Sequence, residues 1–182
     1  MRRLVLMRHA KTEATNPQGD KARRLTSRGV QDSQEAGVEL AALSVDYALV
    51  STAVRTRETF AATGLDVPAE FQDALYFHGT ETMLARIGET DDGVRCLLVI
   101  GHAPTIPSLT AELAYASDQH AADEAQCWYP TAAFSTFEFD GSWAELFQQQ
   151  ILAWQRDTPT QEEVEDTLDS YVGLAQNPVV VH

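Results

Sequence analysis

The strongest constraint on the fold is a set of short, fully apolar runs separated by longer segments with helical periodicity. Three runs are typical of buried strands, namely Leu4 to Met7, Tyr47 to Val50 and Cys96 to Ile100. Strands that are apolar on both faces are characteristic of parallel sheets covered by helices on both sides. A fourth strand is predicted from Phe134 to Phe139, where alternation favours a sheet with one face more exposed, near an edge.

The segments between these runs predict helices. Four are expected, at Ser27 to about Leu43, Ala53 to Thr63, Thr80 to Ile87 and Thr105 to about Tyr115. Ser27 and Thr80 are candidate caps of their helices. The buried side of the first helix is expected to carry Val30, Ala36, Gly37, Leu40 and Ala41. Because strands and helices alternate, the sequence predicts a single-domain three-layer α/β/α sandwich with a mostly parallel central sheet.

The length of the chain fits one domain. With 182 residues, there is room for one sizeable core and little room for a second. Residues 1–154 are predicted to form this domain. Residues 155–182 differ in character, with an acidic stretch from Gln161 to Asp166 and an apolar end. They are predicted to form a partly ordered acidic extension, with a helix followed by a docking strand as the alternative.

Charge and composition narrow the class of partner. The formal net charge of −14 disfavours nucleic acid, although ten of the thirteen Lys and Arg residues fall in the first 57 positions, where a small anion could bind. No apolar run approaches the roughly 20 residues that cross a bilayer, and the run that ends at Arg8 is too short for a signal peptide. Cys96 and Cys127 have neither disulfide-framework nor metal-site spacing. We therefore expect a cytoplasmic protein without a membrane partner.

Three predicted strands are each followed by a basic or imidazole side chain. Arg8 and His9 follow the first strand, Arg55 follows the second, and His102 follows the third. Ligands of open α/β sheets bind beyond the carboxyl ends of the strands, so these side chains are expected to meet at one edge. Each signal is weak by itself, since a single histidine or arginine is more often structural. Together they favour a functional anion site.

The residues at these three places resemble known signatures. Leu6-Met7-Arg8-His9-Ala10-Lys11-Thr12 resembles the Arg-His signature of the histidine phosphatase superfamily, which includes the cofactor-dependent phosphoglycerate mutases. The segment from Ser51 to Thr59 is similar to the second signature, Ser-x-x-x-Arg-x-x-x-Thr, and Gly101-His102-Ala103-Pro104 is similar to the third, Gly-His-x-Pro. The short length, Ala10, and the Pro130-Thr131-Ala132-Ala133 segment are most similar to the SixA branch of phosphohistidine phosphatases.

This resemblance spans about Leu4 to Trp143 and implies a phosphoglycerate mutase-like fold and a phosphatase without metal or other cofactor. It also implies that His9 is the nucleophile and passes through a phosphohistidine intermediate. The chemistry agrees, because a neutral imidazole can attack phosphorus when its other nitrogen donates, often to a backbone carbonyl. Arg8 and Arg55 would clamp the phosphoryl oxygens, and a protonated His102 would stabilise the transition state.

Several other residues are candidates for the same pocket. Thr12 is predicted to offer a hydroxyl to the phosphate, with a helix or loop cap as an equal alternative, and Ala103 is predicted to offer a backbone N–H. Trp128 and Tyr129 could line one wall of the site. Since neighbouring residues of a regular strand point to opposite faces, Arg8 and His9 can share a phosphate only if the chain turns just past Met7.

The general acid has two candidates. Asp73 is the first, because it stands where the mutase-like branch places its carboxylate, and Glu81 is the second. An acidic surface residue is the alternative for both. An enzyme without a strong acid favours N–P bonds, because an imidazole leaves more readily than an alkoxide. The preferred substrate is therefore phosphohistidine on a protein.

Two other classes of function remain open. One is a small-molecule phosphomonoesterase or mutase, for which Lys11, Lys21, Arg23 and Arg24 offer cations without a clear pattern. The other is a non-catalytic phosphopeptide-binding module. The retention of His9 beside both arginines and His102 argues against the module, because binding alone does not need a nucleophile. The expected partner is a phosphorylated protein or a small phosphorylated molecule.

Overall fold

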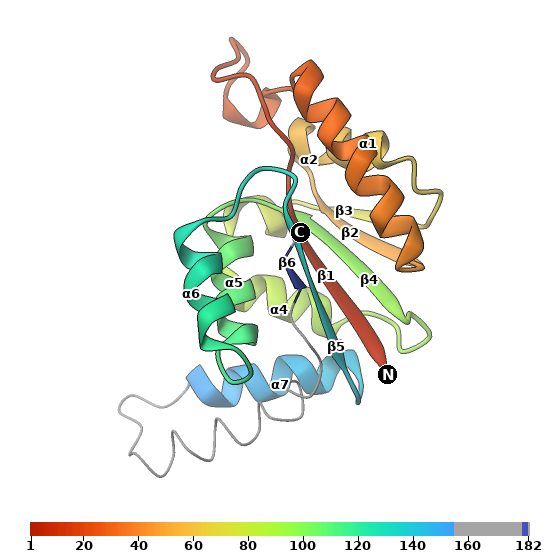
Figure 1. Cartoon of the computed structure of the whole chain (residues 1–182), viewed down its shortest axis with the longest axis vertical. Coiled ribbons are helices and arrows are strands. Elements are labelled where there is room, and N and C mark those ends of the chain that lie inside the picture. The colour runs from red at the N-terminus through yellow and green to blue at the C-terminus, as the bar shows by residue number, and fades with distance from the viewer. Residues whose placement is uncertain (155–179, 182) are drawn as a thin grey trace.

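A computed structural model describes residues 1–154 and 180–181 (Figure 1). Most of the predicted acidic extension, residues 155–179 and 182, lies outside the described residues. The predicted division into a domain over 1–154 and an extension over 155–182 therefore stays a prediction. Among the described helices, none is long and apolar enough to cross a membrane.

The described strands form a six-stranded sheet with the order β3-β2-β4-β1-β5-β6. Their bounds are β1 Arg2–Arg8, β2 Tyr47–Ser51, β3 Ala69–Gln72, β4 Cys96–Gly101, β5 Phe134–Phe139 and β6 Val180–Val181. The pairs β1–β4, β2–β4 and β2–β3 are parallel, whereas β5 is antiparallel to both β1 and β6. The sheet is thus mixed and mostly parallel, as the sequence predicted.

Helices cover both faces of the sheet (Figure 1). One face packs against α1, Ser27–Ala42, and α2, Val54–Thr63. The other face packs against α4 Thr80–Gly88, α5 Thr105–Ala114, α6 Gln119–Cys127 and α7 Trp143–Trp154. Two short elements, the 3-10 helix η1 at Asp20–Ala22 and α3 at Ala74–Phe77, lie in connections. The predicted three-layer α/β/α sandwich is confirmed.

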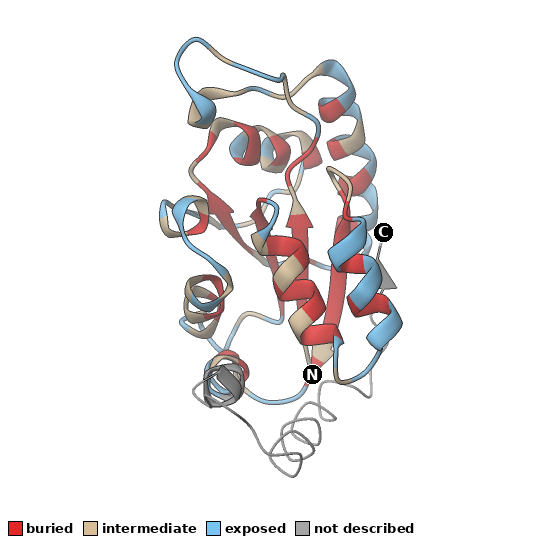
Figure 2. Ribbon diagram, turned by 90° about the vertical axis from the view of Figure 1, so that its left-hand side faces the viewer, coloured by how far each residue is buried: buried red, intermediate tan, exposed pale blue. Residues whose placement is uncertain are grey.

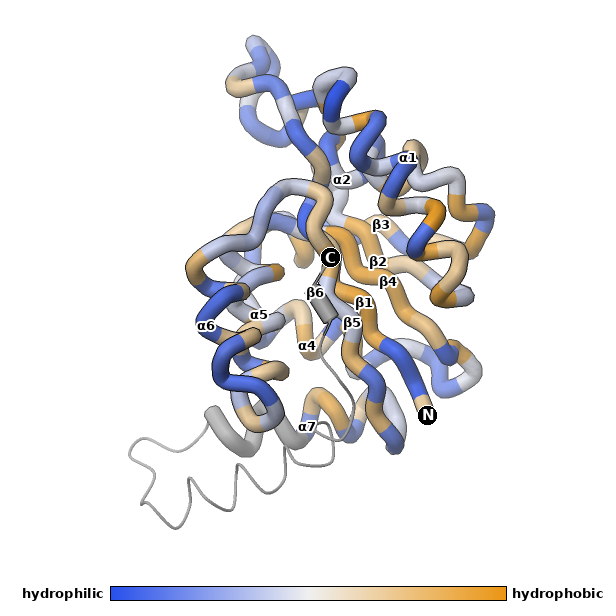
Figure 3. Tube along the Cα trace, in the orientation of Figure 1, coloured by the Kyte–Doolittle hydropathy of each residue, from blue (hydrophilic) through white to orange (hydrophobic). Residues whose placement is uncertain are grey.

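The alternation of side chains along β1 explains why this strand is apolar throughout. Leu4 and Leu6 belong to the core under α4 to α7, while Val5 and Met7 belong to the core under α1 and α2. Figure 2 shows the central strands as buried, and Figure 3 shows the apolar residues concentrated along β1, β2 and β4. Burial of both faces anchors β1 and β4 firmly, and their ends carry the residues of the candidate site.

Three local predictions need correction. The side chain that caps α1 is Thr26, whose hydroxyl accepts from the backbone N–H of Gly29, and Ser27 is the first helical residue. Likewise, α4 has Gly79 at its cap position, and Thr80 begins the helix. Val30 is exposed, because the first turn of α1 buries Gly29 instead. A Cβ at Gly29 would stand 2.1 Å from the carbonyl oxygen of Lys11, so α1 packs directly on the loop that follows β1.

The set of buried residues on α1 differs slightly from the prediction. Ala36, Gly37 and Leu40 are buried as predicted, but Ala41 is exposed and Ser33 is buried. Ser33 can be buried because its hydroxyl donates to the Gly29 carbonyl one turn earlier. A small residue at this point lets the helix approach the sheet closely.

The prediction that one face of β5 is more exposed was wrong. Phe134 packs in one core and Phe137 in the other, so neither face of this strand is notably exposed. The strand does lie near an edge, as predicted, because only the two-residue strand β6, which pairs with Ser135 and Thr136, lies on its outer side. The edge strand on the opposite side of the sheet, β3, was not predicted from the sequence, since it has only four half-buried or exposed residues.

Candidate active site

The three strand ends singled out in the sequence lie together. Strands β2, β4 and β1 are neighbours, so their carboxyl ends share one edge of the sheet. His9 follows β1, Arg55 is in the first turn of α2, and His102 follows β4. These side chains are only 7%, 6% and 8% exposed, respectively. The His9 and His102 ring centroids are 5.3 Å apart, so the two imidazoles face one small space.

His9 has the geometry of a nucleophile. Its Nδ1 lies 2.8 Å from the carbonyl oxygen of Ala10. A carbonyl can only accept, so Nδ1 carries the hydrogen and Nε2 keeps its lone pair. Burial, together with the positive charges of Arg55 and Arg8, lowers the pKa of His9 to about 4. The imidazole is therefore neutral at physiological pH.

His102 is neutral in this structure as well. Its Nε2 is 2.7 Å from the hydroxyl oxygen of Ser51, while its Nδ1 is buried without a partner. Burial and the nearby Arg55 lower its pKa to about 3. If the Ser51 hydroxyl donates to Nε2, Nδ1 carries the hydrogen and can donate to a ligand. The protonated His102 that we expected requires a bound anion to raise its pKa.

Arg8 joins the site from the last position of β1. The strand continues through Arg8, so the chain turns one residue later than the predicted turn just past Met7. One terminal nitrogen of Arg8, Nη1, donates to the Tyr129 carbonyl at 2.7 Å. The guanidinium is close enough to lower the pKa of both His9 and His102. The Arg8 guanidinium is therefore within electrostatic range of both imidazoles, although Arg8 and His9 are adjacent in sequence.

Among the residues that the structure describes, three buried nitrogen atoms of the candidate site have no hydrogen-bond partner. They are Arg8 Nε, Arg55 Nε and His102 Nδ1. Buried donors are almost always satisfied, and an unsatisfied one costs roughly 1–3 kcal/mol, so a cluster of three calls for a ligand. Two guanidinium donors and one imidazole donor beside a neutral nucleophilic nitrogen match a tetrahedral oxyanion.

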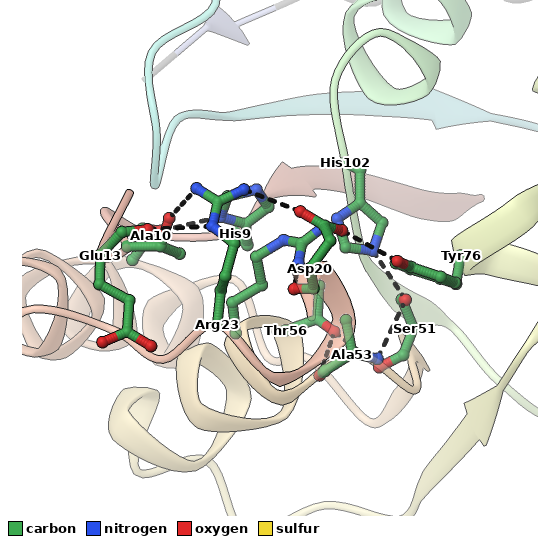
Figure 4. A network of polar contacts seen from close by, with 12 residues as sticks. His9, Ala10, Glu13, Asp20, Arg23, Ser51, Ala53, Thr56, Tyr76 and His102 are labelled. Atoms are coloured by element: carbon green, nitrogen blue, oxygen red, sulfur yellow. Dashed lines mark hydrogen bonds and ion pairs between the residues drawn. The ribbon is translucent and has the colours of Figure 1, made fainter. Parts of the chain in front are cut away.

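A second group of side chains, of which the sequence indicated only Arg23 as an available cation, forms a polar network beside His9 and His102 (Figure 4). The carboxylate of Asp20 in η1 accepts from Arg55 at 3.1 Å, from Arg23 at 2.9 Å and from the Tyr76 hydroxyl at 2.9 Å. Tyr76 packs edge-on against His102, with ring centroids 5.5 Å apart. Asp20 lies in a loop without any periodic pattern, so only its proximity to a conspicuous run of basic residues could have drawn attention to it.

The two candidate acids, Asp73 and Glu81, are both exposed. Asp73 is exposed, forms an ion pair with Lys21 at 2.6 Å and accepts a hydrogen bond from Thr52. The hydrogen bonds from Lys21 and Thr52 lower its pKa, which favours the ionised form over the acid. Glu81 is exposed in the first turn of α4. Both carboxyl groups are thus exposed, and Asp73 is in addition held by Lys21 and Thr52.

Of the remaining residues predicted for the site, some contact its side chains and others are exposed. The Thr12 hydroxyl accepts from Arg23 Nη2 at 2.7 Å, so it holds Arg23 in this structure. Ala103 is exposed directly after His102, and its predicted N–H contact with phosphate stays a prediction. Tyr129 is buried and contacts Arg8 through its carbonyl, whereas Trp128 is exposed. In the described part of the chain, no group of three or more His, Cys, Asp or Glu side chains is arranged to hold a metal ion.

The two lowered histidine pKa values make stability depend on pH. An unfolded histidine has a pKa near 6.5, so between pH 6.5 and about 4 the unfolded chain binds more protons than the folded one. The contribution of the two neutral histidines to the free energy of unfolding is therefore fully present above pH 6.5 and is lost as the pH falls from 6.5 to about 4. We expect the free energy of unfolding to drop by about 2 kcal/mol per histidine between pH 7 and pH 5.

Urea unfolding at pH 7 and pH 5 measures this drop. The variant His102→Asn should show roughly half of it, because only His9 then contributes. Equal stability of the wild type at the two pH values would mean that the histidines are not held in their neutral form.

Comparisons with known proteins agree with the site. A family model of the histidine phosphatase superfamily (branch 1) matches residues 4–76, and a model described as a protein of unknown function (DUF3567) matches residues 135–182. An uncharacterized protein of Mycobacterium tuberculosis is 37% identical over 144 residues, which cover 77% of this chain and 91% of that protein.

Two solved structures are also similar. One, from Nakamurella multipartitia and provisionally described as the phosphohistidine phosphatase SixA, has a TM-score of 0.73 and 37% identity over 81% of this chain and 90% of that chain. The other is the protein histidine phosphatase SixA complexed with tungstate, with a TM-score of 0.64 and 25% identity over 76% of this chain and 88% of that chain. The family match, this identity and the shared fold show that the chain belongs to the histidine phosphatase superfamily and is an enzyme of the phosphatase class.

Proposed function

We propose that this phosphatase hydrolyses phosphohistidine on a protein, without a metal ion, through a phosphohistidine intermediate on His9. The observation that carries the proposal is the state of His9. Its Nδ1 is committed to the Ala10 carbonyl and its pKa is near 4, so Nε2 is an available nucleophile. Arg8, Arg55 and His102 each have a buried side-chain nitrogen without a partner, and His102 faces His9 with ring centroids 5.3 Å apart.

The reaction then has two steps. In the first, His9 Nε2 attacks phosphorus, the P–N bond of the substrate breaks, and the leaving nitrogen departs as a neutral imidazole that was already protonated at its other nitrogen. In the second, water attacks the phosphoryl group on His9, the P–N bond returns its electron pair to Nε2, and one proton of the water goes to an oxygen of the phosphate that is released. Phosphoryl transfer depends mainly on positioning and charge, which the guanidinium groups supply.

The state of the nearby carboxyl groups favours an N–P bond over an alkyl ester. Asp73 is exposed and ion-paired with Lys21, and the pKa of Asp20 is lowered to about 2, so neither holds a proton at neutral pH. An alkoxide leaving group needs such a proton, because its conjugate acid is about as weak as water, with a pKa near 15.7. An imidazole, with a pKa near 6.5, leaves without help from an enzyme acid.

The surroundings of the site support a protein as the carrier of the phosphohistidine. Phe77, which is 69% exposed, packs against Tyr76 beside His102. Trp128, which is 73% exposed, directly precedes the residue whose carbonyl holds Arg8. Exposed aromatic side chains are enriched where proteins bind one another. A similar structure is of a protein histidine phosphatase, which agrees with this assignment.

Initial rates on three substrates test the proposal: a phosphohistidine peptide, p-nitrophenyl phosphate and an unactivated sugar phosphate. We expect kcat/KM for the peptide to exceed that for the sugar phosphate by at least about tenfold, because only the sugar ester needs a general acid. The aryl ester serves as a control for the nucleophile, since its leaving group is activated. If only the aryl ester is cleaved, the substrate class moves to small esters, and appreciable turnover of the sugar phosphate contradicts the N–P preference.

A further inference from the structure

The phosphate-binding side of the site already contains an anion, the carboxylate of Asp20. Its Oδ2 accepts from Arg55 Nη2 at 3.1 Å and from the Tyr76 hydroxyl at 2.9 Å, while its Oδ1 accepts from Arg23 Nη1 at 2.9 Å. Two of the three guanidinium groups near His9 therefore donate to Asp20. Hydrogen bonds from Arg23 and Tyr76 lower the pKa of Asp20 to about 2, so this carboxylate is ionised at all physiological pH values.

This carboxylate is not needed to hold the two arginines in place. Arg55 Nη1 also donates to the backbone carbonyl of Asp20 at 2.9 Å, a contact that no side-chain substitution removes. Arg23 is held independently, because its Nε donates to the Glu13 carbonyl at 2.9 Å and its Nη2 donates to the Thr12 hydroxyl at 2.7 Å. The main contribution of the Asp20 side chain is therefore its negative charge and its use of guanidinium donors.

We propose that the Asp20 carboxylate is an internal anion that competes with phosphoryl oxygens for Arg55 and Arg23 and thereby weakens the binding of free phosphate. Asp20 is thus a specificity-determining residue rather than a positioning residue. This inference rests on the proposed function only because it takes the ligand of the site to be a phosphoryl group.

The charges at the site support this role. Three guanidinium charges, from Arg8, Arg23 and Arg55, less the one carboxylate of Asp20, leave two positive charges beside two neutral histidines. A site with three uncompensated cations would hold the product phosphate dianion tightly and release it slowly. Because Asp20 returns to the guanidinium groups when phosphate leaves, it favours product release, whereas the substrate gains further contacts from the molecule that carries its phosphoryl group.

Calorimetric titration with inorganic phosphate at pH 7.5 and constant ionic strength tests the inference. We expect Asp20→Asn to bind phosphate roughly tenfold more tightly than the wild type, because one nearby negative charge is removed at a partly screened distance. Asp32→Asn is the matched control, since it also removes one carboxylate from an ion pair with an arginine, Arg28, but within α1 and outside the polar network of Asp20. It should bind phosphate like the wild type.

The outcomes separate the possible roles. Weaker phosphate binding by Asp20→Asn would show that the carboxylate positions Arg55, and unchanged binding would show that it does not compete, so either result overturns the inference. Asp20→Ala, which removes the side chain without adding an amide, should also tighten binding, and thermal unfolding checks that both variants are folded. The titration needs no turnover. If Asp20→Asn binds phosphate more tightly while the wild type does not hydrolyse the phosphohistidine peptide, the proposed function is refuted and the role of Asp20 stands.

Discussion

Replacement of His9 by alanine is expected to lower kcat on a phosphohistidine peptide by at least roughly 10⁴-fold. The variant keeps Arg8, Arg55 and His102, so the cluster of phosphate donors is preserved. It loses Nε2 of His9, whose lone pair is available because Nδ1 donates to the Ala10 carbonyl. Without a nucleophile, no covalent intermediate forms, and the residual rate reflects attack by water on a bound phosphoryl group. Single-turnover and steady-state rates on the peptide measure the loss.

A matched control separates this effect from a general effect of losing a histidine. His120 is exposed on α6, where it pairs with Glu124, so His120→Ala should keep the wild-type rate. His9 is buried, so the unfolding midpoint of His9→Ala must be compared with that of the wild type at the assay temperature. A folded His9→Ala variant with more than about a tenth of the wild-type rate would remove His9 from the mechanism and favour the phosphopeptide-binding alternative.

The parts of the fold that could be predicted are those in which burial determines the residue type. Strands β1, β2 and β4 are covered on both faces, so every position must be apolar and the sequence pattern is continuous. The edge strand β3 has no such requirement. Glu70 and Phe71 are exposed there, so its four residues resemble a loop in the sequence. The prediction missed β3 because the neighbour of this strand is solvent on part of its surface and not the core.

The candidate site divides in the same way. Arg8, His9, Arg55 and His102 follow well-defined strands, and the rule that parallel strands end at one edge brings them together without further information. Asp20, Arg23 and Tyr76 come from a loop and from a four-residue helix, whose paths depend on tertiary contacts. The hydrogen bonds that hold Arg23 on the Glu13 carbonyl and on Thr12 join residues about ten apart in an aperiodic segment. No local pattern encodes such contacts.

The histidines show a further limit of prediction from sequence. The type and order of His9 and His102 indicate a phosphoryl-transfer site, but their protonation states depend on how deeply each ring is buried. We expected His102 to be protonated beside an anion, whereas its surroundings in this structure lower its pKa to about 3. A phosphoryl dianion is then required to supply the charge that holds a proton on His102, so binding and protonation are coupled.

Arg55→Lys is expected to lower kcat/KM on the same peptide by roughly 10²- to 10³-fold, although the positive charge is kept. Arg55 uses three donors in three directions. Its two terminal nitrogens reach the carbonyl and the carboxylate of Asp20, and its buried Nε has no partner in the structure. A lysine ammonium is a single point of charge and cannot keep the bond to the Asp20 backbone carbonyl and donate to the phosphoryl group in the same geometry.

Arg57→Lys is the control for this substitution, because it lies two residues further along α2 and is exposed, with its guanidinium over the Phe71 ring. Its kcat/KM should stay within about twofold of the wild type, as is usual for surface changes away from a site. If Arg55→Lys were equally mild, charge alone would suffice at this position. The planar geometry of the guanidinium, and with it the assignment of Arg55 Nε to the phosphoryl group, would then be wrong.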